Sequence, residues 1–262
     1  MGAVREIMLN IMLSGCCGSM GRAVTAFADN RDDIKITAGI DREGRECRFP
    51  TFVSPFSFNG KVDVIIDFSS PAALPGLLEY AVSAKTPTVI ATTGLNEAHT
   101  ALIYKAAKEI PIFFSANMSL GINLLCELAK TAARVLGGTY DIEIVETHHA
   151  QKTDAPSGTA LMLADAISSE LERKPYYEYD RHLRRTKRPH DEIGIHSIRG
   201  GTAVGEHEII FAGYNETIKL SHCAQSKELF VAGAVNAAKF IQNKEPGLYG
   251  MSDMIDRKDA KK

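Results

Sequence analysis

Short apolar runs alternate with helix-compatible segments between residues 7 and 115 of the chain. The predicted strands are residues 7–14, 34–40, 62–68, 88–92 and 112–114, and the helices between them begin near Gly21, Pro71 and Asn96. Continuous Val, Ile and Leu runs, rather than strict alternation, are what a parallel sheet covered on both faces requires. The order of strands and helices therefore predicts an α/β, Rossmann-like dinucleotide-binding domain over residues 1–119.

The pattern changes after Leu120. A helix is predicted up to about Gly137, and residues 140–147, 193–199, 204–211 and 217–222 alternate apolar with polar side chains. Such alternation is typical of strands with one face in water, and the intervening glycines favour an antiparallel meander. We therefore expect a second, α+β domain with a mixed, largely antiparallel sheet over residues 120–229. Residues 230–262 are expected to form a C-terminal segment that returns to the dinucleotide-binding domain.

Charge and hydropathy exclude two classes of partner. The chain of 262 residues has a formal net charge of −2, which gives no reason to expect binding to nucleic acid. Only residues 182–190 are locally basic, and they fit either a solvated loop or an electrostatic funnel for an anionic substrate or cofactor. The apolar stretch 7–13 is interrupted by Asn10 and is too short for a membrane span, so no membrane partner is expected.

The cysteines indicate a reducing, cytoplasmic environment. They stand at positions 16, 17, 47, 126 and 223, without a CxxC pair or the spacing of a metal site. Their odd number also argues against a disulfide framework. The sequence therefore predicts free thiols and no metal site.

A glycine trio follows the first predicted strand directly. It belongs to a loop that reads Gly15, Cys16, Cys17, Gly18, Ser19, Met20 and Gly21, a GxxGxxG pattern. Residues without a Cβ allow a tight turn and let backbone N–H groups and a helix N-terminus approach a pyrophosphate. A glycine-rich turn can also serve packing alone, so the trio by itself is a weak signal.

Two charged residues strengthen the dinucleotide interpretation. Asp41 follows the second predicted strand, where a carboxylate would accept hydrogen bonds from the adenosine ribose of NADH. Arg42 comes next, and its guanidinium could pair with the 2′-phosphate of NADPH. The sequence therefore predicts NADH, NADPH or both as cofactor. An exposed turn without a ligand remains the alternative for these two residues.

Small polar residues stand at three further strand ends. In an open α/β sheet, ligands bind beyond the carboxyl ends of the strands, although each such residue could equally cap a helix. The last of these ends falls where the chain leaves the first domain, which predicts a hinge beside the cleft. The groups are Ser69 with Ser70, then Ala91, Thr92 and Thr93, and finally Ala116, Asn117, Met118 and Ser119.

The densest polar cluster spans residues 146–160. His148, His149 and Lys152 place proton donors and cations on one short loop. Ser157, Gly158 and Thr159 then open a predicted helix, whose N–H groups and hydroxyls suit a carboxylate. Taken singly, a histidine could be a packed residue and Ser157 a helix cap. The two adjacent histidines lack a third ligand at metal spacing, so zinc is not expected there.

The same run resembles the signature of the dihydrodipicolinate reductase family. It fills the pattern E-x-H-H-x-x-K-x-D-A-P-S-G-T-A at every named position. The resemblance extends over nearly the whole chain through shorter segments. These are the glycine loop, residues 67–69, 92–94 and 115–119, Gly121, Asn123, Arg199, residues 204–207, His222 and residues 247–249.

The resemblance implies a Rossmann domain followed by a domain for substrate binding and tetramerisation, usually in a homotetramer. It implies reduction of a small cyclic imine dicarboxylate with NADH or NADPH. His148 would be the general acid/base and Lys152 the second proton donor. Substrate would be bound by His149, Lys152, Ser157, Gly158 and Thr159. Dinucleotide would contact Gly15 to Met20, Asp41, Arg42, Ala91 to Thr93 and Ala116 to Ser119.

Some positions depart from the family's pattern. Ser19 stands where many relatives carry a cation, which favours NADH slightly, and Ala91 stands where glycine is common. Cys16 and Cys17 lie at a helix N-terminus, where the pKa of a thiol is expected to fall. Two other functions remain possible. One is a semialdehyde dehydrogenase with Cys126 as nucleophile, and the other is a dinucleotide-sensing protein, which would not need the His148 cluster.

Overall fold

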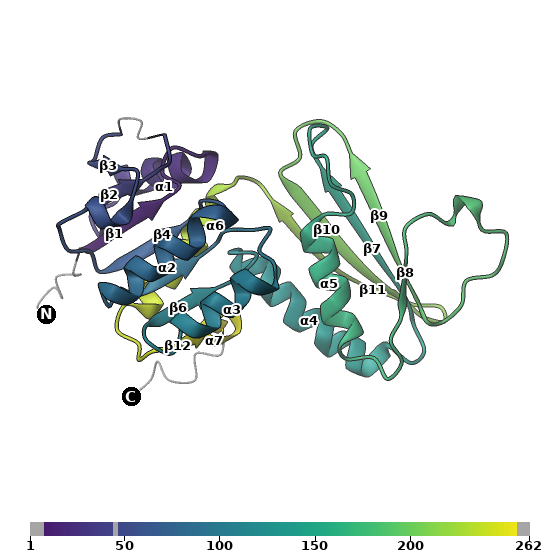
Figure 1. Ribbon diagram of the computed structural model, residues 1–262. Helices are drawn as coiled ribbons and strands as arrows, with labels where there is room; N and C mark the ends of the chain where they lie inside the picture. The colour runs from purple at the N-terminus through teal and green to yellow at the C-terminus, as the bar shows by residue number, and fades with distance from the viewer. Residues whose placement is uncertain (1–7, 44–46, 256–262) are drawn as a thin grey trace, which may run out of the picture. The chain divides into compact units, whose positions relative to one another are not determined.

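The computed structural model describes residues 8–43 and 47–255, and the side chain of Leu183 is not described. The predicted start of the first strand at Ile7 therefore lies outside the described residues. The chain divides into two compact units (Figure 1). Unit 1 comprises residues 1–118 and 227–262, and unit 2 comprises residues 119–226.

Unit 1 contains a parallel sheet, as its continuous apolar runs predict. Its strand order is β12-β6-β5-β4-β1-β2-β3, and every pairing is parallel. The order reverses between β1 and β4, which is where open α/β sheets bind ligands. The strands are β1 (Leu9–Ser14), β2 (Ile34–Ile40), β3 (Thr51–Phe52), β4 (Val64–Asp67), β5 (Thr88–Ile90), β6 (Pro111–Phe114) and β12 (Gly247–Tyr249).

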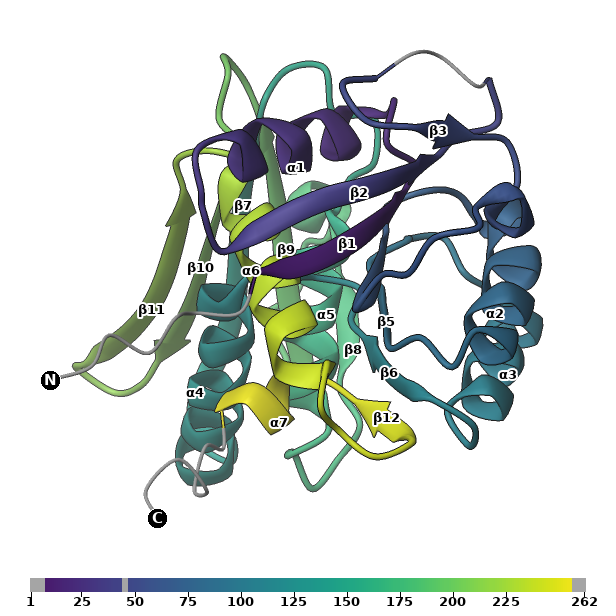
Figure 2. The ribbon, with the colours of Figure 1, turned by 90° about the vertical axis from the view of Figure 1, so that its left-hand side faces the viewer.

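Helices cover both faces of this sheet (Figure 2). On one face α1 (Ser19–Asp29) packs beside α6 (Glu228–Ile241), and on the other α2 (Leu74–Ser83) packs beside α3 (Glu97–Ala106). Because both faces are covered, the central strands β1, β4, β5 and β6 bury nearly all their side chains, and Ile11, Leu13 and Ile65 are fully inaccessible to solvent. The short elements β3, β12 and α7 (Met251–Ile255) were not predicted.

Unit 2 is a mixed sheet with the order β11-β10-β7-β9-β8. Its strands are β7 (Asp141–His148), β8 (Tyr176–Glu178), β9 (Glu192–Arg199), β10 (Gly205–Ala212) and β11 (Thr217–Ala224). The mixed sheet confirms the prediction, but the antiparallel meander is wrong for β9. β10 lies antiparallel to both β7 and β11, whereas β9 lies parallel to both β7 and β8. A helix between β7 and β8 provides the crossover that parallel strands need.

The helices of unit 2 are α4 (Leu120–Leu136) and α5 (Gly158–Ser168). They pack against each other and bury the apolar side chains of one sheet face, among them Ile144, Ile195 and Phe211. Since strand side chains alternate between faces, Glu146 and His148 on β7 point to the same side as Ile144. The helix-covered face of this sheet therefore carries the polar cluster at its end.

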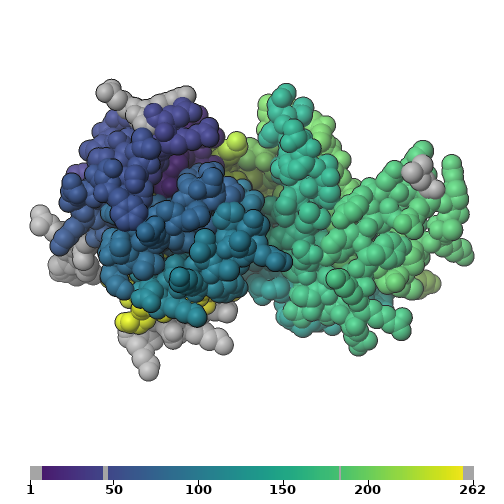
Figure 3. Space-filling view, in the orientation of Figure 1, coloured from purple at the N-terminus to yellow at the C-terminus, as the bar shows by residue number. Residues whose placement is uncertain are grey.

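The basic run lies in the connection between β8 and β9, which extends from unit 2 (Figures 1 and 3). Because these neighbouring strands are parallel, the chain must return along the sheet before β9 begins. Arg188 attaches this connection to β7, because its guanidinium lies 2.8 Å from Asp141 Oδ1 and 2.9 Å from Glu143 Oε1. Arg181 pairs with Glu192. These arginines anchor the loop to the sheet, a role that neither sequence interpretation included.

None of the helices among residues 8–43 and 47–255 combines the length and apolar character needed to cross a bilayer.

Candidate active site

The glycine loop joins the end of β1 to the start of α1. Gly15 has a positive φ of 77°, and a Cβ there would lie 2.6 Å from the Phe68 carbonyl oxygen. A Cβ on Gly21 would lie 2.2 Å from the Gly15 carbonyl oxygen. Gly18 is the N-cap of α1, with no side-chain cap and no acidic residue in the first turn. The helix start therefore presents backbone N–H groups and positive potential to an anion.

A cavity of about 470 Å³ opens beside this loop within unit 1. Gly15, Gly18, Asp41 and Arg42 are among its lining residues. The Asp41 carboxylate accepts hydrogen bonds from the backbone N–H groups of Cys17 at 3.1 Å and Glu43 at 3.2 Å. These bonds fix the carboxylate at the end of β2, where a ribose would bind. The residues present therefore fit the adenosine and pyrophosphate half of a dinucleotide.

Several residues that were predicted to bind the cofactor have side chains that bond to, or pack against, the rest of the protein. Thr92 Oγ1 donates to Asp67 Oδ2 at 2.7 Å, and burial raises the pKa of this aspartate. Met118 is buried in the core of unit 1, and Ser119 Oγ accepts a hydrogen bond from Ile122 N as the N-cap of α4. A contact from Met118 to a ligand would therefore have to use the backbone, and the Ser119 hydroxyl already caps a helix.

The thiols of the loop differ from the expectation. Cys16 is almost fully buried in the core of unit 1, and Cys17 is half-buried. Burial, followed by the neighbouring thiols, raises the pKa of Cys16, and burial also raises the pKa of Cys17. The expected fall in thiol pKa is therefore wrong, because desolvation outweighs the helix N-terminus.

A buried carboxylate organises the end of the sheet in unit 2. Glu146 has no exposed surface, and its Oε2 lies 2.6 Å from His148 Nδ1. Arg199 donates from Nη1 to Glu146 Oε2 at 2.8 Å and from Nη2 to Oε1 at 2.7 Å. The backbone N–H of Ser157 donates to Oε1 at 3.1 Å. One carboxylate therefore holds residues from three separate segments.

Strand register explains this convergence. Glu146 and His148 are two residues apart on β7 and share a face. The parallel pairing of β7 with β9 places Arg199 opposite His148, and the antiparallel pairing with β10 places His207 opposite Glu146. The rings of His148 and His207 meet edge to face, 5.3 Å apart, and His207 Nε2 lies 3.0 Å from Ser157 Oγ.

The electrostatics follow from burial and pairing. Burial alone would raise the pKa of Glu146, but hydrogen bonds from Arg199 and His148 lower it to about 2. Glu146 is therefore ionised at neutral pH and accepts the hydrogen bond from His148 Nδ1. Burial, followed by the charge of His148, lowers the pKa of His207 to about 4. His207 is therefore neutral at pH 7.

The lowered pKa of His207 predicts an acid-sensitive stability. Between pH 6.5 and about 4 the unfolded chain binds a proton that folded His207 does not. The free energy of unfolding therefore falls as the pH drops through this range, by at most about 3 kcal/mol from this residue. His207→Gln should remove that part of the slope in urea unfolding at several pH values. Exposed His182→Gln should keep the wild-type slope, and an unchanged slope in His207→Gln would contradict the prediction.

The loop after β7 holds the other predicted substrate residues. Lys152 Nζ pairs with Asp154 Oδ1 at 2.8 Å, and its side chain is 22% exposed. Ser157 is the N-cap of α5, where its hydroxyl accepts a hydrogen bond from Ala160 N at 3.1 Å. The Ser157 hydroxyl thus has structural partners, whereas Gly158 is exposed at the first position of α5.

Sequence reasoning gave no role to Glu146, Arg199 or His207. The position of Glu146, two residues before His148 on a predicted strand, could have indicated that the two side chains share a face. Arg199 and His207 required the strand pairing. Cys126 is buried in the core of unit 2, and burial raises its pKa to about 11. That environment favours a structural thiol over the nucleophile of a semialdehyde dehydrogenase.

A glycine loop that fits a dinucleotide on a parallel α/β unit, with a buried Glu146 and His148 pair on a mixed-sheet unit, is typical of nicotinamide-dependent oxidoreductases. Residues 9–118 match the N-terminal domain of dihydrodipicolinate reductase, and residues 121–255 match the C-terminal domain. The chain belongs to the dihydrodipicolinate reductase family. This confirms the resemblance seen in the sequence, together with the expected enzyme class and nicotinamide cofactor.

Individual relatives agree with this assignment. The 4-hydroxy-tetrahydrodipicolinate reductase of Caldanaerobacter subterraneus is 49% identical over 251 residues, covering 96% of this chain and 100% of the relative. That of Clostridium botulinum is 47% identical, covering 95% and 98%. A solved structure, dipicolinate-bound dihydrodipicolinate reductase from Paenisporosarcina sp. TG-14, has a TM-score of 0.78 at 23% identity, covering 95% of this chain and 100% of that one. At that identity the structure supports the fold.

Proposed function

We propose that this chain reduces 4-hydroxy-tetrahydrodipicolinate, through dihydrodipicolinate, to tetrahydrodipicolinate in lysine and diaminopimelate biosynthesis. The observation that carries the proposal is the buried Glu146 carboxylate against His148 Nδ1. This contact fixes the orientation of His148, a proton donor, within the motif that the family shares. The reaction needs both units, because the dinucleotide loop belongs to unit 1 and this cluster belongs to unit 2.

The proton is assigned to His148. A bound nicotinamide dinucleotide supplies hydride to an electron-poor ring carbon, and the charge that develops on the ring must be neutralised. Since Nδ1–H donates to Glu146, Nε2 is the nitrogen that gives up or takes the proton. Gly205 leaves room there, because a Cβ on it would lie 3.0 Å from His148 Nε2.

The two substrate carboxylates are assigned to the loop after β7. Lys152 and His149 would supply cationic or N–H donors, and Lys152 would exchange its pairing with Asp154 for a substrate carboxylate. The start of α5 at Gly158 and Thr159 would hold the other carboxylate with backbone N–H groups. Lys152 is also the second proton donor in this proposal.

The proposed activity is tested in a coupled assay. The upstream synthase, pyruvate and aspartate semialdehyde generate the unstable substrate, and absorbance reports the consumption of reduced nicotinamide. Consumption should require all three components and this chain. If the rate with the synthase does not exceed the rate without it, for NADH and NADPH alike, the proposed function is refuted.

Cofactor choice is assigned to Asp41 and Arg42. The Arg42 guanidinium is 90% exposed and lies 3.8 Å from Glu43, so it can turn to a 2′-phosphate. We expect Arg42→Ala to lower kcat/KM for NADPH by about tenfold, the size of one charge-assisted hydrogen bond, and to leave NADH use unchanged. Lys61→Ala, an exposed change elsewhere in unit 1, is the control. Unaltered NADPH kinetics in Arg42→Ala would remove this role.

We further propose a cytoplasmic homotetramer. All five cysteines are free thiols, as a reducing compartment requires. In the described part of unit 2, α4 and α5 cover one sheet face, and the opposite face includes Val145, Ile210 and the half-exposed Ile198. A second copy of this face could cover those side chains. Light scattering after size-exclusion chromatography should give four times the chain mass, and a monomer would contradict this assembly.

A further inference from the structure

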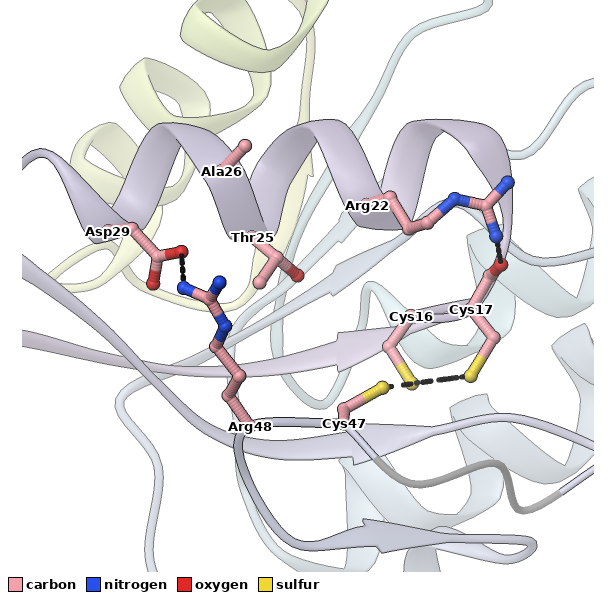
Figure 4. A pocket seen from close by; sticks show the side chains of 8 residues that line it. All are labelled: Cys16, Cys17, Arg22, Thr25, Ala26, Asp29, Cys47 and Arg48. Atoms are coloured by element: carbon pink, nitrogen blue, oxygen red, sulfur yellow. Dashed lines mark hydrogen bonds and ion pairs between the residues drawn. The ribbon is translucent and has the colours of Figure 1, made fainter.

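Three thiols from two separate segments converge beneath the glycine loop (Figure 4). Cys17 Sγ lies 3.7 Å from Cys47 Sγ and 3.9 Å from Cys16 Sγ, and all three sulfurs lie within 4.8 Å of one another. Cys16 and Cys17 end the turn after β1, whereas Cys47 lies thirty positions further along, before β3. The sequence spacing gave no hint of this cluster, because thirty positions separate Cys47 from Cys17.

The sulfur separations match those of a metal-thiolate site. Zinc binds cysteine sulfur at about 2.3 Å in a tetrahedral arrangement, which places two ligand sulfurs about 3.8 Å apart. The observed 3.7 Å and 3.9 Å agree with this value, and the third pair, Cys16 and Cys47, lies within 4.8 Å. A disulfide would require the sulfurs to approach to about 2.05 Å. It would also need an oxidant, which metal binding does not.

The surroundings leave access for an ion. All three cysteines line a cavity of about 370 Å³ within unit 1, distinct in its lining from the dinucleotide cavity except for Cys17. Arg22 donates to the Cys17 carbonyl oxygen, and Arg48 is paired with Asp29 at 2.7 Å. Neither guanidinium is bonded to a sulfur in Figure 4, so the metal ion itself must displace the thiol protons. The cavity provides solvent for a fourth ligand position.

We propose that Cys16, Cys17 and Cys47 bind one thiophilic divalent metal ion, represented by Zn²⁺, as three thiolates with a water molecule as fourth ligand. Each thiol releases its proton to the solvent on binding, so the affinity rises with pH. The ion ties the dinucleotide loop to the segment before β3. No group of the acid–base cluster belongs to this site, although Cys16 and Cys17 also belong to the loop assigned to the dinucleotide.

Metal binding to the full-length, metal-free and reduced protein tests the proposal. Co²⁺ should bind as one ion per chain and give near-ultraviolet thiolate-to-cobalt charge transfer with the intensity of three sulfur ligands. Zn²⁺ should displace it. Cys47→Ser should weaken Zn²⁺ binding by more than about 100-fold in competition with a chromophoric chelator, since even changes outside the ligand shell cost about 10- to 100-fold. Cys223→Ser, an exposed thiol in unit 2, is the matched control.

Circular dichroism establishes that each variant is folded, and Cys17→Ser provides a second ligand deletion. The proposal is overturned if the wild-type cobalt complex lacks sulfur charge transfer. It is equally overturned if folded Cys47→Ser and Cys17→Ser bind Zn²⁺ as tightly as Cys223→Ser. Conversion of the reduced thiols to a Cys17 to Cys47 disulfide in air, with no metal uptake beforehand, would replace the metal site by a redox pair. These readouts do not depend on reductase activity.

Discussion

His148→Gln is expected to lower the turnover number by a factor of about 10² to 10⁴, the usual contribution of one acid–base group. The amide of glutamine can still donate a hydrogen bond to Glu146, so the buried carboxylate keeps a partner. It has no proton to give to the reacting ring, however. The expected loss therefore lies in kcat, measured in the coupled assay at saturating reduced nicotinamide.

Cofactor binding separates this role from a structural one. His148 belongs to unit 2, and the glycine loop with its cavity belongs to unit 1, so the dissociation constant for NADH should change little. Quenching of reduced nicotinamide fluorescence measures it directly. His190→Gln is the control, because His190 is 86% exposed and pairs only with Asp141 among its described contacts. Equal turnover in His148→Gln and wild type would refute the assignment of the proton to His148.

The fold of unit 1 was predictable because its strands are buried on both faces. Continuous apolar runs such as β1 and β4 have no other stable environment in a chain of this composition. The strands that were not predicted, β3 and β12 in unit 1 and β8 in unit 2, have two or three residues and lie at the sheet edges. So few residues carry no periodicity, and their position depends on the neighbouring strand rather than on their own sequence.

In the sheet of unit 2, the alternation of apolar and polar residues predicted the strands but not their relative directions. Period-two patterns identified β7, β9, β10 and β11 as strands, but the same pattern fits parallel and antiparallel neighbours. The choice was decided by the crossover through α5 and by the anchored loop before β9. Both are long-range features. A meander inferred from glycines between strands could not include them.

The site residues likewise fall into those that a local motif reveals and those that only tertiary contacts bring together. His148, Lys152 and Ser157 stand in one contiguous motif and could be read from it. Arg199 joins them only because β9 pairs in register with β7. Cys47 meets Cys16 and Cys17 only because the chain returns beside the glycine loop before β3. Local sequence carries chemistry and turn geometry, whereas the second set of contacts depends on tertiary pairing.

Arg199→Met is expected to destabilise the protein by about 3–5 kcal/mol, the cost of removing one partner from a buried ion pair. Arg199 supplies two of the hydrogen bonds that Glu146 accepts, and Glu146 has no access to water. Methionine keeps apolar volume but leaves this carboxylate with only the hydrogen bonds from His148, the Ser157 N–H and the Ser197 side chain. Urea unfolding at pH 7 measures the change.

The pH dependence identifies the cause of that loss. In the wild type the pKa of Glu146 is lowered to about 2, below its ordinary 4.5, because burial, which would raise it, is outweighed by the combined hydrogen bonds, of which those from Arg199 contribute most. The resulting stabilisation is complete above pH 4.5 and is lost as the pH falls through about 2. Without Arg199, burial raises that pKa, and protonation then relieves the unpaired charge. The difference between wild type and Arg199→Met should therefore narrow as the pH falls below 5, whereas a lost packing contact would give a constant difference.

Lys219→Met removes an exposed ion pair with Glu208 in the same unit and should cost less than about 1 kcal/mol. Equal destabilisation by the two substitutions would show that the carboxylate under His148 does not depend on Arg199.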